Sequence, residues 1–161
     1  MLDSATLDDL EAKDGPLFYC EPVPAPGPDP RMWPELARQA AFIAFIRKSQ
    51  PQLFAYALTN AGKRGPKAIA QAKAEGLIPG VFDTLVCWDV RTGNPDAPAT
   101  VAWIEWKGFD KTGRPGKLSP AQIEFGNRKH RMGLSVACFY TVKGALQWLA
   151  SLGAPIRGAV A

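Results

Sequence analysis

The chain has 161 residues and a mass of 17.4 kDa, enough for one domain with a hydrophobic core and too short for two ordinary domains. Hydrophobic residues make up 47% and charged residues 21%, which excludes global disorder and fibrous repeats. The net charge of +4 is unevenly spread, because residues 1–30 carry −6 and residues 31–161 carry +10. A body this basic is a candidate for binding a polyanion.

The chain lacks the residues that membrane proteins, secreted proteins and histidine- or zinc-dependent enzymes need, so these classes of protein are disfavoured. No run of about 20 uncharged apolar residues occurs, so we expect no transmembrane helix and no membrane partner. The acidic start is unlike a secretory signal, and three scattered cysteines favour a reducing cytoplasm. His130 is the only histidine, which disfavours Cys/His zinc sites, histidine triads and Cys–His nucleophile pairs. Any chemistry would then depend on carboxylates, lysine and water.

Residues 1–30 are predicted to form an acidic, proline-rich arm. Seven of the 15 prolines lie in residues 16–34, and proline at alternate positions of 21–30 blocks both helix and strand pairing. We therefore expect an extended tether before a domain that spans residues 31–161, with the fold beginning near Pro34.

Beyond Pro34, apolar spacing and turn residues predict helices that alternate with strands. We expect helices over about 34–48, 66–75, 120–132 and 143–151, and strands over 53–58, 81–88, 101–107 and 135–141. The 53–58 segment could instead extend the first helix. This order predicts an α/β fold with a mixed central sheet flanked by helices.

Polar residues at the ends of two apolar strands indicate where chemistry could occur. Asp83 comes early in one strand, and Glu105 and Lys107 come late in the next. If these strands form a hairpin, Asp83 and Glu105 become near neighbours. Two carboxylates and a backbone carbonyl near Trp106 suit Mg²⁺ or Mn²⁺, and Lys107 could hold water or a phosphoryl oxygen, which fits phosphodiester hydrolysis. The alternative is a solvent-facing ion pair of Asp83 and Lys107.

Three ordered segments resemble the VRR-NUC family, the virus-type replication-repair branch of the PD-(D/E)xK nucleases. They are residues 76–83 (GLIPGVFD), 103–108 (WIEWKG) and 116–122 (GKLSPAQ). Several motifs in one order are more specific than any single motif. The resemblance covers about residues 31–150.

Two upstream features extend the resemblance, and one position departs from it. Glu35 followed by Gln39 is similar to the family's first-helix acid, and residues 60–64 (NAGKR) are similar to its glycine-rich basic loop. The family usually has proline before the strand aspartate, where this chain has Phe82. That proline shapes the backbone and does no chemistry, so every residue that the chemistry needs is present.

The resemblance implies a PD-(D/E)xK restriction-endonuclease-like core of order α-β-β-β-α-β and a DNA endonuclease that uses Mg²⁺ or Mn²⁺ and no organic cofactor. The implied catalytic residues are Asp83, Glu105, Lys107 and Gln122, and the metal ligands are Glu35, Asp83, Glu105 and the Trp106 backbone carbonyl. Gln122 could equally cap its own helix, and Glu35 could merely suit a helix dipole, so these two roles depend on the resemblance.

Two basic loops are candidates for DNA contact, although each could be simply a polar loop. The residues are Asn60, Lys63, Arg64 and Lys67 in the first loop, and Lys111, Arg114 and Lys117 in the second. We expect the second loop, residues 108–118, to be mobile and to guide DNA beside the metal. His130 is interpreted as solvated or phosphate-facing, and Trp103 and Trp106 as core or interface residues.

The favoured function is metal-dependent cleavage of branched or duplex DNA, resembling a Holliday-junction resolvase that leaves a 5′-phosphate and a 3′-hydroxyl. Such an enzyme would act as a homodimer, because a two-fold junction presents two equivalent strands. The expected setting is DNA repair in the cytoplasm of a bacterial or phage-infected cell. The alternatives are a non-catalytic DNA-binding module and a restriction-type, sequence-specific nuclease on the same core.

Overall fold

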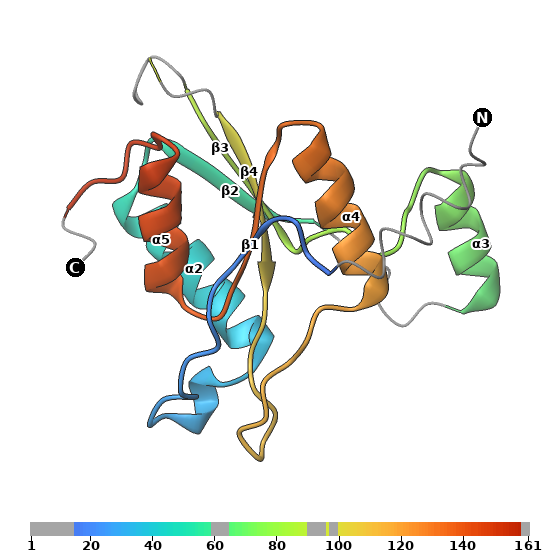
Figure 1. Cartoon of the computed structure of the whole chain (residues 1–161), viewed down its shortest axis with the longest axis horizontal. Coiled ribbons are helices and arrows are strands. Elements are labelled where there is room, and N and C mark those ends of the chain that lie inside the picture. The colour runs from blue at the N-terminus through green and yellow to red at the C-terminus, as the bar shows by residue number, and fades with distance from the viewer. Residues whose placement is uncertain (1–14, 59–64, 90–95, 97–99, 159–161) are drawn as a thin grey trace.

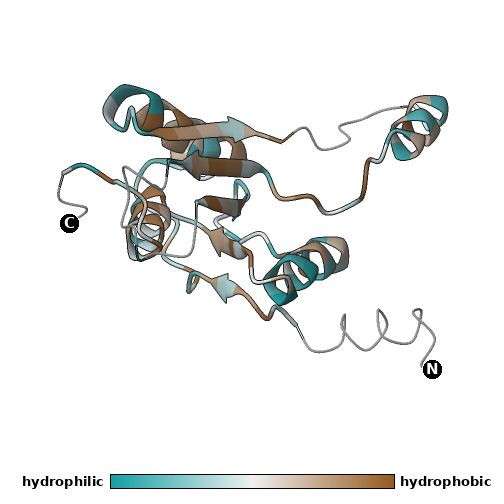
Figure 2. Ribbon diagram, turned by 90° about the horizontal axis from the view of Figure 1, so that it is seen from above, coloured by the Kyte–Doolittle hydropathy of each residue, from teal (hydrophilic) through white to brown (hydrophobic). Residues whose placement is uncertain are grey.

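The computed structural model describes residues 15–58, 65–89, 96 and 100–158, and shows a central sheet with helices on both faces (Figures 1 and 2). The strands are β1 (Tyr19–Cys20), β2 (Leu53–Ala57), β3 (Thr84–Trp88), β4 (Val101–Trp106) and β5 (Ser135–Phe139). The helices are the 3₁₀ helix η1 (Pro30–Met32), α2 (Glu35–Ser49), α3 (Pro66–Ala74), α4 (Pro120–Arg131) and α5 (Val142–Ser151).

The sheet is mixed, as the sequence predicts. Its strand order is β1-β5-β4-β3-β2, with β2, β3 and β4 antiparallel and with β4, β5 and β1 parallel. The segment 53–58 forms a strand and does not extend the first helix, because β2 pairs along its whole length with β3. The predicted α/β class, with helices on both sides of the sheet, is therefore confirmed.

Two apolar cores lie on opposite faces of the sheet. The larger packs α2 and α5 against alternate residues of the strands, with the Phe42 and Trp106 rings 5.1 Å apart. The smaller joins Phe125 of α4 to Phe18 and Phe82. Trp106 is fully buried, which confirms the interpretation of this tryptophan as a core residue. Each helix in the described residues is too short or too polar to cross a bilayer.

Residues 15–21 belong to the packed fold, so the fold begins earlier than the sequence predicts. β1 pairs in parallel with β5 at the edge of the sheet. Phe18 packs against Gly126 of α4, where a Cβ atom would collide with its ring. The Glu21 carboxylate accepts hydrogen bonds from the backbone N–H groups of Tyr140 and Thr141, where α5 begins. The alternating prolines of residues 22–30 follow β1 in the chain, so they leave its pairing with β5 undisturbed.

One further expectation needs correction. Asp83 lies in a bend before β3, which begins at Thr84, so Asp83 is not within a strand. The 108–118 loop forms a hairpin in which Phe109 bridges to Pro115, and its mobility stays a prediction. The Asp110 carboxylate also accepts from two backbone N–H groups at the hairpin tip, those of Thr112 (2.7 Å) and Arg114 (3.0 Å).

Candidate metal centre

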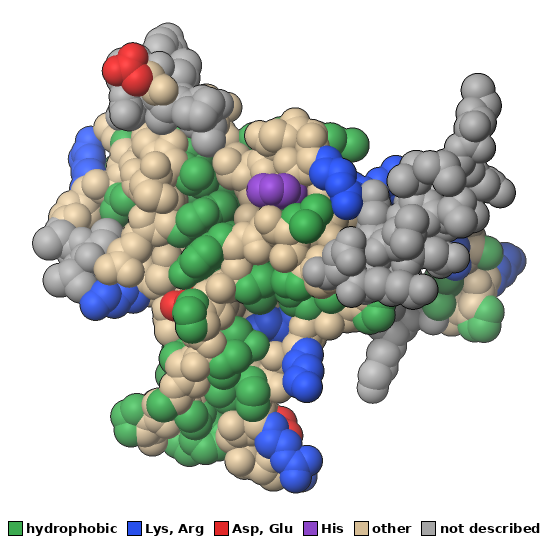
Figure 3. All heavy atoms as spheres, in the orientation of Figure 1, with side chains coloured by type: hydrophobic (Ala, Val, Ile, Leu, Met, Phe, Trp, Pro, Cys, Tyr) green, Lys and Arg blue, Asp and Glu red, His purple; other side chains and the backbone are tan. Residues whose placement is uncertain are grey.

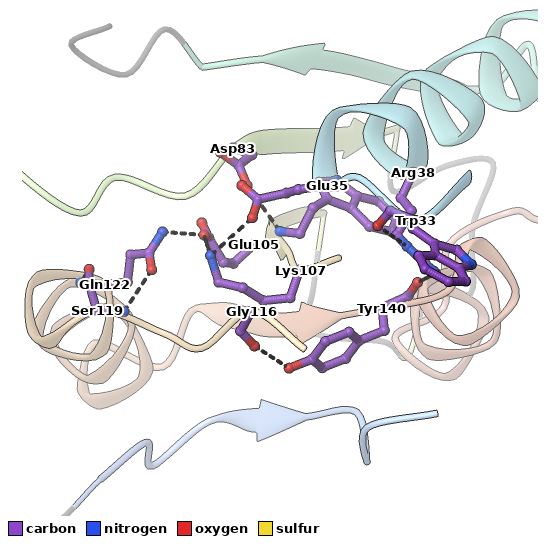
Figure 4. Close-up of polar contacts among 11 residues, drawn as sticks. Trp33, Glu35, Arg38, Asp83, Glu105, Lys107, Gly116, Ser119, Gln122 and Tyr140 are labelled. Atoms are coloured by element: carbon purple, nitrogen blue, oxygen red, sulfur yellow. Dashed lines mark hydrogen bonds and ion pairs between the residues drawn. The ribbon is translucent and has the colours of Figure 1, made fainter. Parts of the chain in front are cut away.

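Three carboxylates converge at the ends of two interior strands, where β3 begins and β4 ends (Figure 4). Glu35 is the first residue of α2, Asp83 precedes β3, and Glu105 is near the end of β4. One carboxylate oxygen of each lies within 4.8 Å of the others. Three acidic oxygens this close repel one another unless a cation or protons neutralise them.

The hairpin of β3 and β4 brings Asp83 to Glu105, as the sequence predicts. The antiparallel register pairs Thr84 with Ile104, which places the residue before β3 beside Glu105. Asp83 Oδ2 accepts a hydrogen bond from the Trp106 backbone N–H at 3.0 Å, and Gln39 Nε2 donates to the Asp83 carbonyl at 3.1 Å. These contacts fix the Asp83 carboxylate and its backbone from two elements.

Glu35 reaches the cluster because the start of α2 lies tightly against the chain that follows β4. The Phe109 backbone N–H donates to the Trp33 carbonyl at 2.7 Å. A Cβ atom on Gly108 would collide with the Trp33 carbonyl oxygen and the Glu35 backbone nitrogen. Only glycine therefore allows this approach, which brings together residues more than 70 positions apart in the sequence.

Lys107 holds the carboxylates from inside the protein. Its Nζ lies 2.7 Å from Glu105 Oε1 and 3.4 Å from Glu35 Oε2. The Lys107 side chain is only 6% exposed, so the alternative of a solvent-facing ion pair does not describe it. The three carboxylates raise the pKa of Lys107 against the opposing effect of its burial, so this side chain stays a cation.

Gln122 caps its own helix and also contacts Glu105 of the acidic cluster, and its catalytic role stays a prediction. Its side chain and that of Ser119 form a reciprocal capping box at the start of α4. Its Nε2 also donates to Glu105 Oε1, on the same oxygen that Lys107 binds (Figure 4). A helix cap thus doubles as a support for the acidic cluster.

Glu105 is the buried centre of the cluster, and its second oxygen lacks a partner. In the described part of the chain, Glu105 Oε2 accepts no hydrogen bond although the residue is fully buried. Burial, and then the nearby Asp83 carboxylate, raise the pKa of Glu105 to about 8, in spite of the Lys107 cation. Burial likewise raises the pKa of Glu35, whose side chain is 43% exposed. A hard divalent cation would satisfy the orphaned oxygen and offset this repulsion, so the donor set fits Mg²⁺ or Mn²⁺.

The remaining predicted residues are less directly tied to the cluster. Trp106 takes part through its backbone N–H, and the ligand role of its carbonyl stays a prediction. Lys67 on α3 is exposed, as are three residues in and beside the hairpin: Lys111, Arg114 and Lys117. Asn60, Lys63 and Arg64 lie outside the described residues. Figure 3 shows basic side chains over the hairpin, and a hollow of about 390 Å³ between Glu35 and Arg114 links it to the cluster.

A second group of residues, which the sequence did not single out, braces the site. The Arg38 guanidinium donates to the carbonyls of Trp33 (Nε, 3.3 Å) and Tyr140 (Nη1), and it lies 5.2 Å from the Phe109 ring centroid. The Tyr140 hydroxyl donates to the Gly116 carbonyl at 2.7 Å. An arginine on the apolar face of the first helix was the available signal, because a buried guanidinium needs several acceptors.

The fold and the site define an α/β domain whose mixed sheet carries a cluster of three carboxylates and one buried lysine. Protein-family models, curated proteins and solved structures were compared with the chain, and none of them matches it. The geometry of the site is therefore what bears on the function of this chain.

Proposed function

We propose that this protein is a divalent-metal-dependent DNA endonuclease with a core of the PD-(D/E)xK type, resembling the VRR-NUC family. One observation carries the proposal: Glu35, Asp83 and Glu105 each direct an oxygen to one point, with the Lys107 ammonium buried beside them. Carboxylates that bind a hard cation, together with a fixed lysine, are the groups that phosphodiester hydrolysis requires.

The connectivity supports this core. Leaving α3 aside, the chain runs α2-β2-β3-β4-α4-β5, which is the order α-β-β-β-α-β that the resemblance implies. The acidic residues fall at the same elements as in that pattern, namely the first helix, the strand hairpin and the lysine-bearing strand end. Gln122 lies on the helix that follows.

Glu35, Asp83 and Glu105 would hold the cation, which supplies Lewis-acid polarisation of the scissile phosphate and lowers the pKa of water. Other groups of the protein hold these carboxylates in position. The Trp106 N–H holds Asp83, and Gln122 and Lys107 both hold Glu105 Oε1, which keeps Glu105 in one rotamer. The Lys107 ammonium, dry and cationic, stabilises negative charge that develops on phosphate oxygens during attack by water.

The DNA would approach over the hairpin, where Lys111, Arg114 and Lys117 are exposed beside the cluster. Phosphate contacts of this kind position a substrate without reading its sequence. We propose branched DNA as the preferred substrate and a homodimer as the acting form, as the resemblance implies.

The test is nicking of a four-way junction, a linear duplex and a supercoiled plasmid by the full chain with Mg²⁺ or Mn²⁺. We expect Asp83→Ala and Lys107→Ala to lower the rate by on the order of 10²-fold or more. Glu75→Ala and Lys143→Ala are matched controls, because both residues are exposed and outside the site, and they should keep full activity.

Three results would contradict parts of the proposal. DNA binding without cleavage by either metal would indicate a non-catalytic DNA-binding protein. Cuts at a recurring sequence in long duplex DNA would indicate a restriction-type nuclease. Full activity in both site variants would remove the site assignment, provided that thermal melting shows all variants folded.

A further inference from the structure

A groove of about 400 Å³ runs along α4, and none of its lining residues belongs to the carboxylate cluster. Its apolar lining, the floor of the groove, includes Ile78 and Pro79, Phe125 of α4, and Met132, which directly follows that helix. Ile78 is 52% exposed and Met132 is 66% exposed, so large apolar side chains of the lining face solvent. Exposed apolar surface that is concave and local is typical of a binding site.

The rim of this groove is basic. Arg128 and Lys129 line it, and Lys129 Nζ lies 4.7 Å from the Trp103 ring centroid and 5.6 Å from that of Phe125. These contacts hold the lysine over the apolar floor. Glu124 is the one acidic residue in the lining, and its carboxylate pairs with Arg128 at 3.9 Å. An occupant with apolar side chains and several negative charges would match both the floor and the rim.

The first described residues of the chain are hydrogen-bonded to the same helix, α4. Asn127 of α4 is fully buried, and it donates to the Gly15 carbonyl at 3.0 Å and accepts from the Leu17 N–H at 2.8 Å. Residues 1–14 are therefore attached to the fold at a point fixed on α4. A helix is about 10 Å wide, and 14 residues can reach about 45 Å when extended, so the groove lies well within reach.

Residues 1–14 have the composition that the groove requires. They contain five acidic residues and one lysine, a net charge of −4. Three leucines, Leu2, Leu7 and Leu10, alternate with these acids, and Leu7 and Leu10 have the spacing of neighbours on one helical face.

We propose that residues 1–14 of this chain bind the α4 groove, with leucine side chains on the apolar floor and acidic side chains at Arg128 and Lys129. Tethering favours this occupant over a separate acidic peptide, because a short linker holds it at an effective concentration in the millimolar range. The inference does not depend on nuclease activity.

The test is zero-length cross-linking of the full chain with a carbodiimide, which joins a carboxylate to an amine in contact with it. After tryptic digestion and mass spectrometry, we expect amides between acids of residues 1–14 and Lys129. Their yield should be at least fivefold above the yields to Lys73, Lys111 and Lys117, which are exposed elsewhere. An even distribution over these lysines would overturn the proposal.

Two variants separate docking from attraction by charge alone. The double variant Leu7→Asp with Leu10→Asp adds two negative charges, so attraction by charge alone would raise the yield at Lys129. Docking predicts a fall of fivefold or more. Met132→Gln in the groove should also lower the yield, whereas Met32→Gln, a control at an exposed methionine of η1, should leave it unchanged. Unchanged yields in both groove-directed variants would overturn the proposal.

A mixture of ¹⁵N-labelled and unlabelled full chains identifies the source of the occupant. Cross-links within one isotope class are expected. Mixed-isotope cross-links would contradict the proposal and assign the groove to a second copy of the chain.

Discussion

Glu105 is a fully buried carboxyl whose ionisation is opposed by its burial and by the neighbouring Asp83 carboxylate. One of its oxygens binds Lys107 and Gln122, and the other has no hydrogen-bond partner within the described chain. A carboxyl in this setting favours its protonated form in the absence of metal. Ionisation of Glu105 therefore costs the metal-free fold stability, and the cation that we propose for this site would offset that cost.

The pH dependence of stability follows from this carboxyl. Its pKa in the folded state is about 8, above the ordinary value of 4.5, so between these pH values the folded state binds more protons than the unfolded state. The Glu105 contribution to stability therefore falls as the pH rises from about 4.5 to about 8. At pH 7.5 without metal, we expect Glu105→Gln to raise the free energy of unfolding by about 1–3 kcal/mol.

Thermal melting between pH 5 and pH 8.5 checks this prediction. The difference between wild type and Glu105→Gln should grow with pH, and added Mg²⁺ or Mn²⁺ should stabilise the wild type alone. Glu75→Gln, an exposed control, should follow the wild type. A variant less stable than wild type at every pH would contradict the argument.

Gln122 and Ser119 form a matched pair, because both belong to the capping box but only Gln122 contacts Glu105. We expect Ser119→Ala and Gln122→Ala each to cost about 1 kcal/mol through loss of the cap. Only Gln122→Ala should also change the metal concentration that gives half-maximal thermal stabilisation. Equal metal responses in the two variants would reduce Gln122 to a cap.

At the scale of elements, the site depends on how closely α2 approaches the end of β4. We expect Gly108→Ala to cost about 1–3 kcal/mol, because its Cβ would push the Trp33–Glu35 backbone away. It should also weaken the metal response, since Glu35 moves with that backbone. Gly116→Ala is the control in the same hairpin, because its Cβ would meet atoms no closer than 3.5 Å. Chemical denaturation, with and without Mg²⁺, distinguishes the two.

Glu21 tests whether residues 15–21 stabilise the fold. Its carboxylate accepts from the N–H groups of Tyr140 (2.6 Å) and Thr141 (2.8 Å) and from the Thr141 hydroxyl, at the positive end of the α5 dipole. We expect Glu21→Ala to cost about 1.5–3 kcal/mol in denaturant unfolding. Asp29→Ala, a control that removes only exposed contacts with Arg31, should change the unfolding midpoint little. Similar midpoints in both variants would remove Glu21 as a stabilising cap.

At the scale of the whole molecule, the acidic residues 1–30 do not form one separable segment, because residues 15–21 are part of the fold. A deletion experiment on the acidic segment must therefore stop before residue 15. Removing residues 1–30 would also remove β1, Phe18 and Glu21, which belong to the fold. Charge-neutralising changes within residues 1–14 leave those contacts intact. They are therefore the sound way to ask whether the acidic segment competes with DNA for the basic body.

We expect the double variant Asp8→Asn with Asp9→Asn to tighten DNA binding about two- to fivefold at low salt. The gain should vanish as added salt shortens the screening length. Fluorescence anisotropy measures this directly, in an Asp83→Ala background that we expect not to cleave the DNA. An unchanged affinity at low salt would show that the acidic segment does not compete with DNA.

The sequence by itself determined the order of helices and strands and the meeting of Asp83 with Glu105. Both follow from local patterns: apolar periodicity specifies the elements, and a hairpin aligns the start of one strand with the end of the next. The capping role of Gln122 was equally local. These features need only residues near one another in the chain.

Local patterns did not specify which distant segments complete the site. Only the resemblance led us to expect Glu35 and Gln122 there, and the tertiary structure brings both of them to the acidic cluster. The pairing of β1 with β5, the Arg38–Tyr140 brace and the contact of Gln122 with Glu105 join segments whose approach no local pattern encodes. Glu35 reaches Lys107 because Gly108 lets two backbones touch, and the folded chain leaves only 6% of the Lys107 side chain exposed. Burial and long-range contact are properties of the folded chain, so the raised pKa of Glu105 and the geometry of the acidic cluster appear only there.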